Sequence, residues 1–96
     1  MTIIDVGAGT GFFARAAAAI VGPMGEVLAA DISEEMLAFM REAGLPENVR
    51  PILSQEYAVP LPDGLADIVL AAFVVHEAPD RDRFLTELKR LLKPGG

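Results

Sequence analysis

Three glycines stand at alternate positions where an apolar segment gives way to an alanine-rich one. They are Gly7, Gly9 and Gly11, in the stretch "DVGAGTGFF" that covers residues 5–13. Glycine lets the backbone turn tightly and approach a ligand closely. A helix that begins directly after such a turn offers free N–H groups and the positive end of its dipole to an anion. The glycines therefore indicate a ligand-binding loop, although such a turn can also serve only to pack a helix against a strand.

An acid, Asp31, ends the second apolar segment, "EVLAAD", twenty residues after Gly11. A carboxylate at this place can accept two hydrogen bonds from the diol of a ribose, or it can be an ordinary turn or helix-capping acid. With the glycine loop it predicts a nucleoside-like ligand. The dinucleotide fingerprint G-x-G-x-x-G would need a small residue where Phe12 stands, which disfavours a nicotinamide- or flavin-binding domain.

Segments of strand length alternate along the chain with segments of helical period, which predicts an α/β fold with a parallel sheet. We expect strands over 2–6, 26–31, 49–53 and 66–75, and helices over 10–21, 34–44 and after Pro79. Pro51 suits only an edge strand. Ser33 and Gly44 are expected to cap the second helix. The expected buried faces of the first and last helices are Phe13, Ala16, Ala17 and Ile20, and Phe84, Leu85, Leu88, Leu91 and Leu92.

Composition narrows the classes of function. The 96 residues suffice for one domain at most, and the 52% hydrophobic content suffices for a core. Eight scattered basic residues against fourteen acidic ones give a net charge of −6, which disfavours direct nucleic-acid binding. One histidine and no cysteine make a metal site improbable. The longest apolar run, residues 68–75, is too short to cross a bilayer, so we expect a cytoplasmic protein without a membrane partner.

Four segments in register carry a family resemblance: "DVGAGTGFF", "VLAADISEEML", "VPLPDGLADIVLAAFVVHEAPD" and "FLTELKRLLKPGG". Their order and spacing resemble the class I S-adenosylmethionine-dependent methyltransferases, especially the small-molecule type. The resemblance implies a three-layer Rossmann-like parallel sheet with helices on both faces, and methyl transfer from S-adenosyl-L-methionine to an unidentified, small-molecule acceptor. A binding module for this cofactor without turnover is the alternative.

The resemblance also assigns roles to residues of the first two loops. Asp5 and the three glycines Gly7, Gly9 and Gly11 would hold the methionine part of the cofactor. Asp31 would hold the ribose hydroxyls.

Further positions would surround the adenine. Ile32 and Met36 would flank the base, although Met36 stands at helical spacing with core residues and packing is expected to be its larger role. Many relatives offer an aspartate to the adenine amino group from the loop after the third strand. This chain has Gln55 and Glu56 in that loop, and one of the two is expected to serve.

The end of the fourth strand would pass close to the methionine part of the cofactor. The resemblance implies backbone contacts from Ala72 and Phe73 there. His76 follows on the same side, and a histidine near the acceptor can act as a general base. His76 is therefore the candidate catalytic residue, with a structural role as the alternative.

The chain ends on "KPGG", which is turn chemistry that should lead from a helix into another strand. We expect a domain truncated before the fifth strand, with residues 1–96 forming the cofactor-binding half. In the sheet order 3-2-1-4, the fourth strand would then be an exposed apolar edge. Such an edge predicts a chain that self-associates and does not transfer methyl groups by itself.

Overall fold

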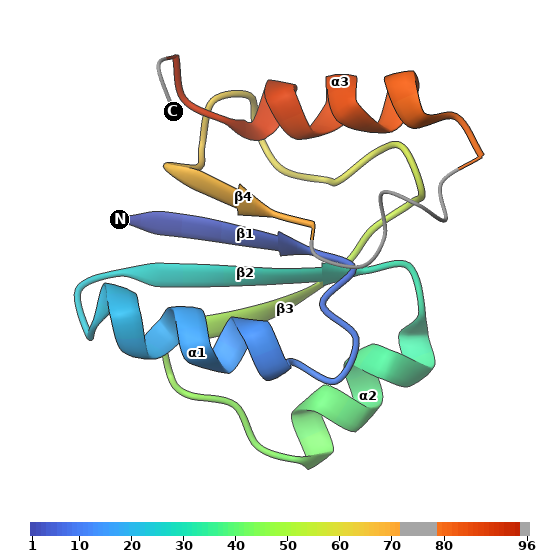
Figure 1. Cartoon of the computed structure of the whole chain (residues 1–96). Helices are drawn as coiled ribbons and strands as arrows, with labels where there is room; N and C mark the ends of the chain where they lie inside the picture. The colour runs from blue at the N-terminus through green and yellow to red at the C-terminus, as the bar shows by residue number, and fades with distance from the viewer. Residues whose placement is uncertain (72–78, 95–96) are drawn as a thin grey trace.

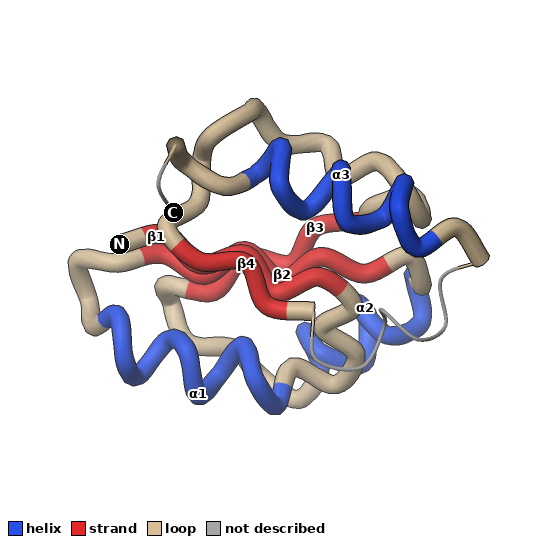
Figure 2. The backbone as a smooth tube through the Cα atoms, turned by 45° about the horizontal axis from the view of Figure 1, so that its top comes forward, coloured by secondary structure: helices blue, strands red, loops and turns tan. Residues whose placement is uncertain are grey.

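The expected sheet order is confirmed by the computed structural model, which describes residues 1–71 and 79–94. Within these residues four parallel strands lie in the order β3-β2-β1-β4. The strands are β1 (Thr2–Val6), β2 (Glu26–Asp31), β3 (Val49–Leu53) and β4 (Ile68–Leu70). The helices are α1 (Phe12–Val21), α2 (Glu34–Glu42) and α3 (Arg81–Leu91). Helices α1 and α2 cover one face of the sheet and α3 covers the other, giving three layers (Figures 1 and 2).

Each face of the sheet has its own hydrophobic core, because successive residues of a strand point to opposite faces. On β1 the alternation puts Ile3 into the core beneath α1 and α2, and Ile4 into the core beneath α3. The second core also contains Val59 and Ala66, from the long connection between β3 and β4. That connection and α3 therefore form one layer on the sheet.

The prediction of the buried face of α1 was right for Ala17 and wrong for Phe13, Ala16 and Ile20, which are exposed. Ala14, Ala17 and Ala18 are buried, whereas Phe13 is 37% and Ile20 is 79% exposed. Alanines let the helix axis lie close to the sheet, and this contact is made along the alanine face. The two large residues are then carried to the outer side of the helix.

Helix α2 begins where Ser33 predicts and ends at Glu42, two residues before the expected end, with Ala43 and not Gly44 at the C-cap. The Ser33 hydroxyl accepts a hydrogen bond from the Met36 N–H at 3.2 Å, and Gly44 follows the helix with a φ of 84°. Its buried residues are Leu37 and Met40. Met36 is 42% exposed, so the expectation that packing is its larger role was wrong.

The two edges of the described sheet differ in chemistry. Pro51 lies in the edge strand β3, as its missing N–H requires. At the other edge, β4 covers only three residues of the expected strand 66–75, of which 72–75 lie outside the described residues. Its Ile68 is 40% exposed. Self-association through this edge stays a prediction, and a monodisperse monomer in light scattering would contradict it.

Helix α3 presents a narrower apolar face to the sheet than its sequence predicts. Phe84 and Leu91 are buried, but Leu85 is 43% exposed and was wrongly assigned to the face.

No helix in residues 1–71 and 79–94 combines the length and the hydropathy that a membrane span requires.

Candidate functional site

The carboxyl ends of β1, β2 and β3 surround a pocket of about 370 Å³. In Figure 1 the loop after β1 and helix α2 lie at this end of the sheet. The pocket is lined by Val6, Gly7, Gly9, Asp31, Ile32, Met36, Ser54, Gln55, Glu56 and Phe84. Most of the residues that the sequence predicts for a cofactor are therefore brought together. A wider hollow of about 820 Å³ adjoins the pocket and shares Ile32, Ser54 and Gln55 with it.

The glycines of the first loop have different structural roles. Gly9 has a φ of 57°, and a Cβ placed on it would meet no atom of the described residues within 4 Å except those of its two chain neighbours. A Cβ on Gly11 would lie 3.0 Å from Met40 Cγ and 3.2 Å from Arg15 Nη1. Gly11 thus allows close packing at the start of α1 and is not among the residues that line the pocket. A cofactor contact by Gly11 stays a prediction.

Asp31 ties the glycine loop to the start of α2. Its Oδ2 accepts a hydrogen bond from the Gly9 N–H at 2.8 Å, and its Oδ1 accepts one from the Ser33 N–H at 2.9 Å. An ionised carboxylate has about four lone-pair sites, so each oxygen retains capacity for a further donor. Asp31 can therefore shape the loop and bind a hydroxyl group of a ligand at the same time.

Asp5 is a carboxyl group that the described residues leave without a partner on one oxygen. The residue is 3% exposed and lies in the middle of the sheet, between Ala29 of β2 and Leu70 of β4. Its Oδ2 is buried and makes no hydrogen bond. Burial raises the pKa of Asp5 from 3.8 to about 6, and the nearby Asp31 carboxylate adds to this rise. A cation beside Asp5 would relieve both effects.

The raised pKa of Asp5 predicts how its removal changes stability. Between about pH 4 and pH 6 the folded chain keeps a proton that the unfolded chain releases, so stability falls as pH rises through this window. We expect Asp5→Asn to change the free energy of unfolding little at pH 4 and to raise it by roughly 1 to 3 kcal/mol at pH 8. Urea unfolding of both proteins at the two pH values measures the difference. An equal effect of the substitution at both values would contradict the assignment.

The profile of the family described as "Methyltransferase domain" matches residues 4–96. The chain belongs to the class I S-adenosylmethionine-dependent methyltransferases. A ubiquinone/menaquinone biosynthesis C-methyltransferase from Pasteurella multocida is 38% identical over 98% of this chain. Among solved structures, an S-adenosylmethionine-dependent methyltransferase from Aquifex aeolicus is 41% identical over 98% of this chain, with a TM-score of 0.89. An arsenic(III) S-adenosylmethionine methyltransferase from Chlamydomonas reinhardtii is 29% identical over the whole chain, with a TM-score of 0.91.

The chain is short beside its relatives. It spans 37% of the Pasteurella protein, 52% of the Aquifex chain and 36% of the Chlamydomonas chain. Each likeness therefore concerns the part of the relative that corresponds to the sheet and pocket described above.

Three of the residues that line the pocket were not predicted from the sequence. Val6 is the last residue of β1 and stands between the assigned Asp5 and Gly7. Ser54 directly follows β3 and precedes the assigned Gln55. Their positions at the carboxyl ends of strands were a usable signal. Phe84 was assigned to the core of α3, and it both packs there and lines the pocket. Ala72, Phe73 and His76 lie outside the described residues, so their roles stay predictions.

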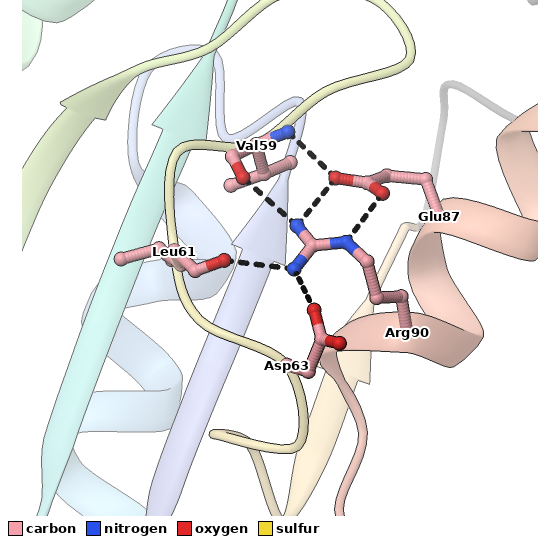
Figure 3. Close-up of polar contacts among 5 residues, drawn as sticks. All are labelled: Val59, Leu61, Asp63, Glu87 and Arg90. Carbon is pink, nitrogen blue, oxygen red and sulfur yellow. Dashed lines mark hydrogen bonds and ion pairs between the residues drawn. The ribbon is translucent and has the colours of Figure 1, made fainter.

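The polar contacts of α3 with the connection between β3 and β4 were also missed. Glu87 and Arg90 of the segment "FLTELKRLLKPGG" bind Val59, Leu61 and Asp63 of the segment "VPLPDG" (Figure 3). Two of the four segments that carry the family resemblance are thus joined directly. The partners are mainly backbone groups, which leave no residue-type signal in a sequence.

Proposed function

We propose that the pocket binds S-adenosyl-L-methionine and that residues 1–96 form the cofactor-binding half of a methyltransferase for a small-molecule acceptor. The observation that carries the proposal is the pocket in which the glycine loop meets Asp31. The buried Asp5 carboxyl does not line this pocket but directly precedes its residues Val6 and Gly7, and its Oδ2 has no partner among the described residues. A buried group of this kind costs stability unless a ligand binds it. The methionine part of the cofactor contains an ammonium and a sulfonium, which supply the missing positive charge.

Different residues around the pocket would bind different parts of the cofactor. Gly9 leaves room for the methionine part, and the free lone pairs of Asp31 accept the ribose hydroxyls. Ile32 and Met36 are 61% and 42% exposed and offer apolar surface to the adenine. Gln55 combines a carbonyl acceptor with an NH₂ donor, and such an amide can pair with the edge of an adenine.

Bound S-adenosyl-L-methionine supplies an electrophilic methyl group, and the acceptor must present a lone pair in line with it. The names of the relatives cover both a quinone-pathway C-methyltransferase and an arsenic(III) methyltransferase, so the acceptor is proposed only as a small molecule.

His76 would remove a proton from an acceptor that carries one. In a methyl-transfer assay of the full-length protein, His76→Ala should then lower turnover while cofactor affinity stays nearly intact. Equal loss of both would mark a structural residue.

Isothermal titration calorimetry of the chain with S-adenosylhomocysteine and with NAD tests the proposal. We expect saturable heat from S-adenosylhomocysteine and none from NAD. Binding of NAD alone would favour a dinucleotide-binding domain instead. A chain that shows a cooperative unfolding transition but binds neither ligand would contradict the proposed function.

A further inference from the structure

Gln55 and Glu56, which line the pocket, belong to a short turn that is not part of the sheet. The Gln55 N–H donates to the Ala58 carbonyl at 2.9 Å, and the Ala58 N–H donates back to the Gln55 carbonyl at 3.3 Å. One end of this turn is attached to the sheet, because the Ser54 N–H donates to the Asp31 carbonyl at 2.9 Å. Because these two hydrogen bonds join the ends of the turn only to each other, the orientation of the turn depends on what holds the residues that follow it.

The other end is held by two side chains of α3. Glu87 Oε2 accepts the Val59 N–H at 2.7 Å, and Arg90 Nη2 donates to the Val59 carbonyl at 2.9 Å. Arg90 Nη1 donates to the Leu61 carbonyl at 2.8 Å and to Asp63 Oδ1 at 2.7 Å (Figure 3). Val59 directly follows the turn. Its N–H is bound by Glu87 and its carbonyl by Arg90, so both of its backbone polar groups are held by charged side chains.

Glu87 and Arg90 are themselves paired rigidly. Arg90 Nε donates to Glu87 Oε1 and Arg90 Nη2 donates to Glu87 Oε2, both at 2.7 Å. The Glu87 side chain is only 12% exposed. The hydrogen bond from Arg90 lowers the pKa of Glu87, and the bond from Glu87 raises the pKa of Arg90, so both groups stay charged. Charge-assisted bidentate pairs of this kind fix geometry as well as adding energy.

A second attachment lies inside the turn. The Asp80 N–H, at the start of α3, donates to Tyr57 Oη at 2.8 Å, and the Arg83 guanidinium lies 4.6 Å from the centre of the Tyr57 ring. Helix α3 thus holds the turn at Tyr57 and at Val59, and its own Phe84 lines the same pocket. Glu87 and Arg90 line neither the pocket nor the adjoining hollow.

We propose that Glu87 and Arg90 are positioning residues, which hold the turn 55–58 so that the Gln55 amide meets the adenine edge of the cofactor. This inference rests on the proposed function and extends it to a pair of side chains that do not touch the ligand. The same pair would set selectivity for the base, because recognition of the adenine amino group by Gln55 requires a fixed orientation of the turn.

The test compares wild type with Arg90→Lys, which keeps the charge but loses the planar fork that reaches two carbonyls. S-adenosylhomocysteine and S-inosylhomocysteine, in which an oxygen replaces the amino group, are titrated by calorimetry. We expect affinity for S-adenosylhomocysteine to fall about tenfold, and the preference for it over the inosine analogue to shrink several-fold. Glu87→Gln, which keeps one oxygen for the Val59 N–H, should shift both quantities in the same direction by less.

A matched control separates positioning from general destabilisation. Val27 is fully buried near the start of β2, in the core beneath α1 and α2, and Val27→Ala should lower stability without changing affinity or base preference. If wild type binds S-adenosylhomocysteine and both α3 variants match its affinity and base preference, the positioning inference is wrong and the proposed function stands. If Val27→Ala reproduces the loss of preference, the inference is also wrong. If folded wild type does not bind S-adenosylhomocysteine, both proposals fail.

Discussion

Gly9→Val is expected to abolish binding of S-adenosylhomocysteine, with affinity lowered by more than about a hundredfold. The Gly9 φ of 57° lies in the left-handed region, which a β-branched residue opposes. Apart from its two chain neighbours, no atom of the described residues lies within 4 Å of the added Cβ, and Gly9 lines the pocket, so the new side chain projects into the space that the ligand would occupy. Calorimetry measures the loss, and circular dichroism checks that the variant stays folded.

Gly44→Val is the matched control for backbone strain. Gly44 has a φ of 84° and open space where a Cβ would lie, but it follows α2 and does not line the pocket. We expect this variant to lose stability and to keep its affinity. A Gly9→Val variant that folds and binds as tightly as wild type would mean that the glycine loop is not part of the proposed binding site.

The strands and their order followed from local signals. Three of the four predicted strands begin and end at the expected residues. Gly7 follows the first strand, the helix capped by Ser33 follows the second, and turns that contain Pro23 and Pro46 precede the second and the third. Pro51 placed one strand at an edge before any pairing was known. These signals act over a few residues, and this is why a sequence reveals them.

What the sequence did not predict depends on tertiary packing. In α1 nearly every residue is apolar, so hydrophobicity could not indicate which side faces the sheet, and the close contact of the alanine face decided it. Arg90 binds carbonyls 29 and 31 residues away in the chain, and no pattern of residue types marks those groups. Asp5 was assigned from its motif, but its unpartnered oxygen follows from burial between two neighbouring strands.

Asp31→Ala is expected to weaken the binding of S-adenosylhomocysteine by about 1.5 to 3 kcal/mol, or about 10- to 150-fold. Two ribose hydroxyls would lose a charged acceptor. The Gly9 and Ser33 N–H groups would also lose the oxygens that they bind at 2.8 and 2.9 Å, so part of the effect would come from a looser glycine loop. Asp31→Asn keeps one oxygen and should fall between wild type and the alanine variant.

A ligand that lacks the hydroxyl separates the two contributions. In wild type, 2′-deoxy-S-adenosylhomocysteine should bind more weakly than the parent compound, because one hydroxyl bound to Asp31 is missing. In Asp31→Ala the two ligands should bind almost equally, since the acceptor for that hydroxyl has gone, and the coupling is read directly from the double-mutant cycle. A loosened loop would weaken both ligands and leave their ratio as in wild type. A ratio that does not change, or an alanine variant weakened less than threefold, would therefore assign Asp31 to the loop and not to the ribose.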